Sequence, residues 1–473
     1  MTTPRVLAAL AGEFTTARWT ARSGDGVLTL MSVVAFAVVT LLANIVAAGT
    51  WMFVGRSRHP SGMLAAAVAE DPSLHFILDL YIFLAGIACA MLVVPAVGLA
   101  TSATVLGARA RERRLATLRL LGMTRSEVSL MGFLDVMLQV LAGVILGSAL
   151  TLPALHPFTR LSFQAMPVTY GELLMPWWAH ALTALAVMLI AAVASAASLL
   201  RVQISPLGVT RRGAPRALRW WRLAVLAVIV AGFMTAPAPS GSTVAWTGGL
   251  VAAMLIVFLV GVDLSMPYVV QVASRLLARA PWVTVSWAAR RVIMEPKQTW
   301  RRIGAIATLL LLASFAGRMP VGGNPDLTGA VQTVGAIMLP DVRTGLLLTV
   351  GFAFALAAVS TMINQASAEF ERADETRAML RMGVSRRRTV AVSWTEVLGP
   401  LAGASVLALA LGWVMGLPFT NARRALADEW NLQPLFSTGL LATAVLAGFV
   451  LMVLALAAVL PIHRRIADRD RRR

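Results

Sequence analysis

Apolar residues in this chain gather into long runs that short polar and basic segments separate. A helix needs about 20 apolar residues to cross the roughly 30 Å hydrocarbon core of a bilayer. The runs that approach or exceed this length are residues 28–54, 76–105, 127–152, 176–202, 222–239, 243–268, 302–320, 342–365, 389–417 and 435–461. Prolines shorten the fifth run and close the seventh, so these two are the weakest. The pattern predicts an all-α polytopic membrane protein with about ten transmembrane helices.

Composition supports the membrane class and the charge distribution orients the chain. Hydrophobic residues make up 58% of the sequence and charged residues 13%, and the mean hydropathy is +0.77, values too apolar for a soluble protein of 473 residues. If the N-terminus is cytoplasmic, 34 of the 41 Lys and Arg residues fall on the inner side. Basic residues flanking membrane spans stay in the cytoplasm. We therefore expect both termini inside a bacterial cytoplasmic membrane, and no nucleic-acid partner for the basic residues.

Two stretches of the chain that lie 261 positions apart, residues 118–125 and 379–386, have nearly the same sequence. Each contains a glycine, Gly122 or Gly383, and 13 residues after each glycine an acid falls inside an apolar run. These acids are Asp135 and Glu396. Internal repeats of this kind indicate a duplicated structural unit.

The two repeated segments predict short amphipathic helices on the cytoplasmic side. Each glycine fits a helix C-cap, where a left-handed residue turns the chain back into the membrane. Thr124 and Ser385 then fit the N-cap of the next span. Such a rigid elbow suits contact with a partner protein, and the alternative is a solvated loop held by lipid headgroups. The elbow residues expected to make the contact are Leu115, Leu118, Arg119, Leu121, Gly122 and Met123 in the first copy, and Met379, Arg381, Met382, Gly383 and Val384 in the second.

Acidic residues inside the apolar runs need partners. An ionised side chain at the depth of Asp135 and Glu396 costs several kcal/mol unless it is paired or near water. We favour a structural ion pair with an elbow arginine such as Arg125 or Arg386 over a proton or substrate site. Asp263 lies near the inner end of the sixth run, where it can reach the interface.

The sequence contains no pattern of catalytic or metal-binding residues. Lys297 is the only lysine and does not follow a P-loop glycine, so this chain has no nucleotide-binding motif of that type. Cys89 is the only cysteine, and the five histidines lack ligand spacing. We expect no enzyme activity, metal or cofactor on this chain, and any ATP and Mg²⁺ must bind a separate subunit. The outer segments, about 20 residues or fewer, are too short for an independent domain.

The repeated pattern resembles the core of the FtsX-like permease family of ABC transporters, the MacB-type or type VII fold. Each copy has a charged run, then a segment that reads Leu-Arg-Leu-Leu-Gly-Met-Thr-Arg at 118–125 and Met-Leu-Arg-Met-Gly-Val-Ser-Arg at 379–386. A span with an early acid and small residues follows, Gly143 and Gly147 or Gly399 and Gly403. Small residues let membrane helices approach closely. The chain departs from the family pattern at Asp135, where the family usually has Glu, and the first copy has Leu120 where the second has Arg381.

The resemblance implies a permease whose elbows bind two copies of a cytoplasmic ABC ATPase. The span count resembles the ten-span, two-module, bacitracin-exporter-like branch of the family. That branch has a large extracellular domain between spans seven and eight, whereas residues 321–341 are too few to hold one. The absence of this domain weakens the inference that the chain shares the peptide sensing of that branch.

The predicted organisation has five parts along the chain. An amphipathic interfacial segment, which would contact membrane lipid, covers residues 1–27 and is followed by a first four-span module at 28–202. A linker with a span pair occupies 203–280 and leads to a second interfacial segment and module at 281–465. A basic cytoplasmic tail completes the chain at 466–473.

Three classes of function fit the sequence. The first is an ABC permease that exports or extracts a hydrophobic or amphipathic compound, such as a drug, antimicrobial peptide, haem or lipid, with a role in efflux and antibiotic resistance. The second is a mechanotransmitter that regulates a membrane or extracellular partner, including a sensor kinase. The third is an ion-coupled secondary carrier, which would need ionisable groups near the bilayer midplane.

Overall fold

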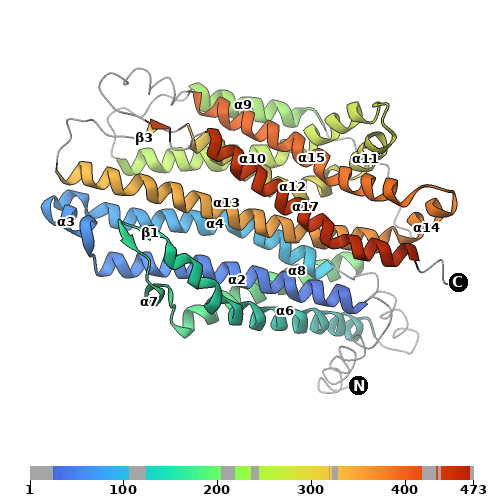
Figure 1. The fold of residues 1–473 in the computed structure, drawn as a ribbon, viewed down its shortest axis with the longest axis horizontal. Helices are drawn as coiled ribbons and strands as arrows, with labels where there is room; N and C mark the ends of the chain where they lie inside the picture. The colour runs from blue at the N-terminus through green and yellow to red at the C-terminus, as the bar shows by residue number, and fades with distance from the viewer. Residues whose placement is uncertain are drawn as a thin grey trace.

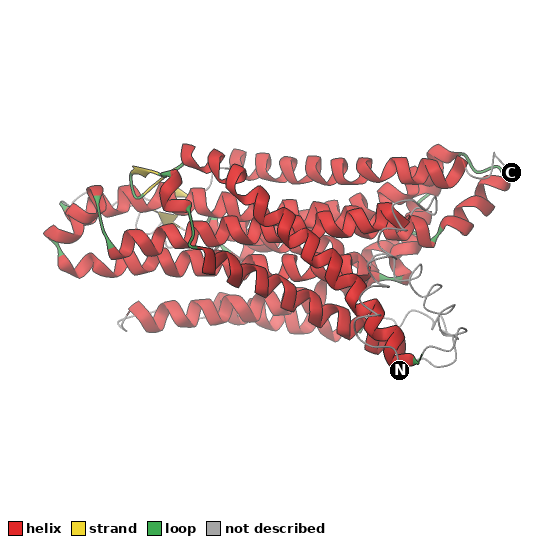
Figure 2. Cartoon of the chain, turned by 90° about the horizontal axis from the view of Figure 1, so that it is seen from below, coloured by secondary structure: helices red, strands yellow, loops and turns green. Residues whose placement is uncertain are grey.

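Long helices that lie side by side make up most of this computed structural model (Figure 1). Figure 2 shows from below that they run in roughly one direction. The structure describes residues 25–105, 124–203, 219–235, 244–318, 320–321, 329–417, 433–434 and 438–468.

The helices follow the predicted order along the chain. The first half contains α2 (Asp25–Arg58), α4 (Phe76–Val105), α6 (Arg125–Leu155) and α8 (Trp177–Gln203). A pair follows, α9 (Trp221–Thr235) and α10 (Val244–Leu277). The second half contains α11 (Val283–Met294), α12 (Pro296–Ala316), α13 (Ala330–Glu371), α14 (Ala373–Arg381), α15 (Arg386–Met415) and α17 (Thr438–Asp468).

The all-helical, polytopic fold predicted from the apolar runs is confirmed, because each run coincides with a helix. Within the described residues, six helices are long and apolar enough to cross a membrane, and shorter apolar helical stretches add to them. The largest difference from the prediction is α13, which begins at Ala330 rather than near residue 342. It continues through Pro340 without a break.

Helix α13 joins the two halves of the molecule. It contacts α4 and α2 from the first half and α17 and α12 from the second, and Figure 1 shows it lying between them beside α4. Ala353 and Leu356 of α13 are buried in the core of the first half. Phe354 and Ala357, on another face of the same helix, are buried in the core of the second half. The two halves therefore share one helix.

Small residues set the spacing of the closest helix pairs. A Cβ added at Gly147 of α6 would lie 2.5 Å from the carbonyl oxygen of Ala37 in α2, so only glycine allows this approach. Gly143 lies against α2 in the same way, and Gly412 of α15 lies against the backbone of α12. Gly399 and Gly403 do not share this role, since a Cβ at Gly403 would meet no described atom within 4 Å. The predicted close approach is thus confirmed at some glycines and wrong at others.

Short structured elements lie where loops were expected, at the end of the molecule that the charge distribution predicts to face outward, and we call it the outer end. Figure 1 shows them at the end opposite α14. They are α3 (Gly62–Glu70), η1 (Pro72–His75), η2 (His156–Arg160), the antiparallel strands β1 (Ser162–Phe163) and β2 (Met166–Pro167), α7 (Tyr170–Leu173), and the pair β3 (Pro320–Val321) with β4 (Gln433–Pro434). We call the elements between residues 153 and 175 the outer cap.

Arg56, at the outer end of α2, holds the outer cap in place. Its side chain is buried and donates hydrogen bonds to both carboxylate oxygens of Glu172, at 3.0 and 2.9 Å. It also donates to the carbonyl oxygens of Phe163 and Pro167 in the two strands, at 2.6 and 3.2 Å. One arginine therefore satisfies backbone acceptors that a short hairpin would otherwise leave without partners.

Candidate coupling site

The second elbow has the helix end that its sequence predicts. Helix α14 ends at Arg381, and Gly383 has a φ of +86°, in the left-handed region that favours glycine. The amide of Val384 donates to the carbonyl of Met379 at 3.0 Å, and the amide of Gly383 donates to that of Leu380 at 3.1 Å. This pair of bonds is a Schellman motif, so the predicted glycine C-cap is confirmed.

The N-caps that follow the elbows differ between the two copies. Thr124 forms a capping box with Glu127 at the start of α6, in which each side chain bonds the other residue's backbone. Ser385 occupies the same position before α15, but its side chain makes no capping hydrogen bond. The prediction of an N-cap residue at both positions is confirmed, and the side-chain bond is present only at Thr124.

The surface of the second elbow is open at its tip. Arg381, Met382 and Gly383 are exposed, and the Met382 side chain reaches 74% exposure. Met379 and Val384 are half-buried, so they lie at the base of the tip. Figure 1 shows α14 at the end of the molecule opposite the outer cap. The predicted contact residues of the second copy thus form one small surface with an apolar, protruding side chain.

The contact residues predicted in the first copy lie outside the described part of the chain. They are Leu115, Leu118, Arg119, Leu121, Gly122 and Met123. Their expected role therefore stays a prediction.

Glu396 of α15, directly above the second elbow, is a buried acid surrounded by arginines. Its side chain is 5% exposed. Arg372 donates to both carboxylate oxygens, at 2.8 and 3.3 Å. Arg291 and Arg302 each place a guanidinium nitrogen 3.6 Å from the carboxylate. Four helical elements, α11, α12, α15 and the junction of α13 with α14, therefore meet at one carboxylate, and we call this group the Glu396 cluster.

Arg291 extends the Glu396 cluster to the elbow helix itself. Its guanidinium lies 3.2 Å from Glu375 of α14 and 5.3 Å from the ring centre of Trp287. Helix α11, which carries both Arg291 and Trp287, is amphipathic and buries Ala288 and Val292. The elbow is thus connected to the membrane helices through charged contacts on two sides.

The predicted ion pair at the acid is present, but different arginines form it. Arg386 or Arg125 was the predicted partner, whereas the contacts of Glu396 come from Arg372, Arg291 and Arg302. Arg372 lies at the turn between α13 and α14, and that turn points its side chain back toward α15. A sequence signal for this partner exists, because an arginine precedes the acid by 24 residues in both copies.

The other two predicted acids have different surroundings. Asp135, the counterpart of Glu396, is buried in α6, and the amide of Gln139 lies 3.5 Å from its carboxylate. Asp263 is exposed and accepts a hydrogen bond from the indole nitrogen of Trp300 at 2.8 Å, which links α10 to α12. The structure therefore does not bring the three acids together into one site.

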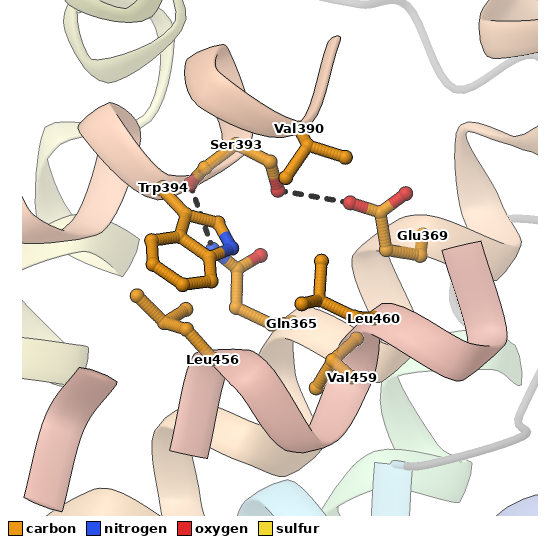
Figure 3. Close-up of a pocket in the computed structure, with 8 residues that line it drawn as sticks. All are labelled: Gln365, Glu369, Val390, Ser393, Trp394, Leu456, Val459 and Leu460. Atoms are coloured by element: carbon orange, nitrogen blue, oxygen red, sulfur yellow. Dashed lines mark hydrogen bonds between the residues drawn. The ribbon is translucent and has the colours of Figure 1, made fainter. Parts of the chain in front are cut away.

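Polar side chains also join α13 to α15 just above the elbow. These helices and α17 line a small pocket of about 20 Å³, with room for about one water molecule. Figure 3 shows the residues that line it. Ser393 donates to the carboxylate of Glu369 at 2.8 Å, and Gln365 donates to the carbonyl of Ser393 at 3.3 Å. These contacts were not predicted, since the partners lie 24 and 28 positions apart in the sequence. They link the two helices that lead to the elbow.

A known family model matches both repeated parts of the chain. The model of the FtsX-like permease C-terminal domain matches residues 85–204 and 347–466, which together make up just over half of the chain. Each match contains one elbow segment and the acid that follows it. No curated protein and no solved structure is significantly similar to the chain.

Proposed function

Because the chain belongs to the FtsX-like permease family, we propose that it couples ATP hydrolysis on separate subunits to the export or extraction of a hydrophobic or amphipathic compound. Members of this family are transmembrane subunits of ABC transporters that pair with ABC ATPases and are not the ATPases themselves. Two repeats in one chain suggest two copies of a cytoplasmic ATPase, which would bind the ATP and Mg²⁺. The bacterial cytoplasmic membrane is the location that we propose.

The second elbow is the observation that carries the proposal. Its helix ends in a Schellman motif, so the exposed tip has a fixed shape, and the protruding Met382 suits an apolar pocket on a partner. A rigid, exposed apolar anchor is the kind of residue that dominates binding at protein interfaces.

The Glu396 cluster gives the elbow a route to the membrane helices. ATP-driven closure of the ATPases would displace α14, and the contacts of Arg372 and Arg291 with Glu396 would transfer this motion to α15 and α11. Allosteric transitions commonly use such rigid-body displacement of packed helices. Ion pairs that hold the helices together favour collective motion over local bending.

Substitution of Met382 tests the docking role. Met382→Glu places a charge on the exposed tip and removes no buried contact, so we expect the protein to fold. Co-purification with a co-expressed ABC ATPase partner should fall about tenfold or more, as for loss of a single interface anchor. The matched control is Met63→Glu at the outer end, which is also exposed, at 59%. Unchanged assembly of Met382→Glu with the ATPase would contradict the proposal.

A mechanotransmitter is the second candidate, and the structured outer end favours it. The outer cap and α3 form a surface that a membrane or extracellular partner, including a sensor kinase, is able to contact. Transport assays in sealed vesicles separate the two candidates. A permease moves its compound when ATP and the ATPase subunits are present, whereas a transmitter hydrolyses ATP without moving any. Transport without the ATPase would indicate an ion-coupled carrier and contradict both.

A further inference from the structure

A cavity of about 310 Å³ lies near the outer end of the helices, away from the coupling site. Helices α2 and α4 of the first half form two walls, and α13 forms a third. The outer cap closes it through residues such as Phe158 and Phe163. Its volume is in the range of pockets that bind small organic molecules.

The walls of this cavity are almost entirely apolar. Leu84 and Leu92 contribute from α4, Leu155 from the end of α6, and Phe352 from α13. The lining threonines already have partners, since Thr50 donates to the carbonyl of Val46 at 3.1 Å. Such a surface favours the apolar body of a ligand through the hydrophobic effect.

One carboxylate interrupts the apolar lining. Asp341 of α13 is 6% exposed and lines the cavity next to Tyr81. Its Oδ2 atom accepts a hydrogen bond from the Tyr81 hydroxyl at 2.7 Å and another from the backbone amide of Gln164 at 2.6 Å. Within the described part of the chain, its Oδ1 atom accepts no hydrogen bond. This oxygen is not fully enclosed by protein atoms, so a donor bound in the cavity is able to reach it, and pairing a carboxylate in apolar surroundings is favourable.

The hairpin of the outer cap is shaped to reach this carboxylate. Gln164 and Ala165, between β1 and β2, both have a φ of +59°, which residues other than glycine adopt at a cost. This conformation points the Gln164 amide at Asp341. Positive φ at both central residues is what a two-residue β-hairpin turn requires, so the turn itself sets the direction of this amide.

The nearest basic side chain does not cancel the charge of Asp341. Arg56 forms two hydrogen bonds with Glu172 and also attracts the Asp341 carboxylate electrostatically. Its single positive charge is therefore shared between two acids. Asp341 remains the acid that faces the apolar cavity.

We propose that this cavity binds an amphipathic cation, with its apolar body between α2, α4 and α13 and an amine N–H donating to Oδ1 of Asp341. This inference rests on the proposed function, and it assigns the substrate to lipophilic amines. The wall that carries Asp341 is the helix that runs down to the elbow α14, so displacement of the elbow also moves the carboxylate.

The test compares two probes on the full chain in phosphatidylcholine nanodiscs. One probe is dansylcadaverine, a lipophilic primary amine, and the other is its neutral N-acetyl derivative with the same apolar body. We expect the amine to bind about tenfold tighter or more, as a charge-assisted hydrogen bond implies. Asp341→Asn should abolish this preference and leave binding of the neutral probe unchanged. Equal binding of both probes by the unaltered protein, or a preference that survives Asp341→Asn, overturns the proposal.

A second variant covers the case in which Asp341→Asn does not fold. Tyr81→Phe keeps the carboxylate and removes one of its donors, so the preference for the amine should persist. Its loss in Tyr81→Phe would assign recognition to the hydroxyl and overturn the role of Asp341.

Filling the cavity shows whether the probes bind there. Gly345 of α13 lines the cavity and has open space around its Cα, so Gly345→Phe should weaken both probes by about tenfold or more. Gly351→Phe is the matched control on the same helix, since Gly351 also has open space but does not line the cavity. Unchanged binding by Gly345→Phe overturns the location.

The outcome is separable from that of the proposed function. Probe binding is measured on the chain alone, whereas ATPase docking is measured at Met382. If the preference for the amine probe is not found but the ATPase docks, only the cavity inference is contradicted. If the ATPase does not dock through Met382 but the amine probe binds, only the ATP-coupled role is contradicted.

Discussion

Glu396 explains how an acid is kept inside a helix bundle. Moving a carboxylate out of water costs several kcal/mol, and this cost is offset only when hydrogen bonds and opposite charges surround it. Arg372 supplies two hydrogen bonds, and Arg291 and Arg302 add charge at 3.6 Å. Removal of the acid leaves these arginines close together without their shared partner.

Glu396→Gln should therefore destabilise the protein strongly. We expect the free energy of unfolding to fall by about 2–4 kcal/mol, because breaking a buried ion pair leaves charge uncompensated. Denaturant unfolding in detergent measures this change. Glu375→Gln is the control, since Glu375 pairs with the same Arg291 but is 50% exposed, and an exposed pair contributes about 1 kcal/mol or less. Equal effects of the two substitutions would show that burial does not set the cost.

Glu172 is a second acid whose pKa is changed by a neighbouring arginine. The hydrogen bonds from Arg56 lower the pKa of the Glu172 carboxyl below its usual value of 4.5. A lowered pKa in the folded state adds stability that is present above the usual pKa and is lost as the pH falls through the folded value. Attachment of the outer cap to α2 should accordingly weaken in acid.

The expected result is a difference between wild type and Glu172→Gln that depends on pH. At about pH 7 the substitution should lower the midpoint of thermal unfolding, because it removes the charge that pairs with the buried Arg56. As the pH falls well below about 4.5, the two proteins should converge, since wild-type Glu172 then becomes protonated. A difference that stays constant over this range would exclude the ionised pair as its source.

At the scale of elements, helix spacing depends on a few glycines. Gly147 of α6 lies against the backbone of α2, and a Cβ there would approach the Ala37 carbonyl oxygen to 2.5 Å and the Thr40 Cβ to 2.8 Å. Gly403 of α15 has open space instead. The two glycines follow the acids of the two copies, yet only one of them is needed for packing.

Gly147→Ala should therefore destabilise the protein, whereas Gly403→Ala should not. The first forces α2 and α6 apart and should cost about 1–3 kcal/mol, as overpacking does. The second should be neutral or stabilise by up to about 1 kcal/mol, because alanine favours the helix more than glycine. Unfolding midpoints of the two variants, measured side by side, check the signs. Destabilisation by both would mean that α15 packs closely at Gly403 as well.

Elements that depend on residues close together in the sequence were predicted correctly. The left-handed cap at Gly383 and the capping box at Thr124 depend on residues a few positions apart, and both were predictable. Arg372 was missed because it reaches Glu396 only through the turn between α13 and α14. Capping rules describe where a helix ends and not where a flanking arginine points.

At the scale of the whole molecule, the apolar runs predicted the helices and the repeat predicted two related halves. They did not predict that α13 is buried in both cores. A helix buried on two faces has the same kind of apolar sequence as a helix that faces lipid. The outer cap was also missed, because residues 153–175 have no periodic pattern and are held by Arg56, about 100 positions earlier. The cavity beside Asp341 arises from four separate segments, so no local pattern could reveal it.

Pro340 gives the long shared helix a built-in joint. Proline has no amide hydrogen, so α13 lacks one rung of its hydrogen-bond ladder immediately before Asp341, and helices bend most readily at such points. Above the joint, Val334 and Ile337 pack with Leu64 of α3 and Tyr81 of α4. Below it, the helix is uninterrupted by proline as far as the elbow. A displacement of the elbow would thus be transmitted along the lower part of α13 and would appear as bending at Pro340, beside the cavity.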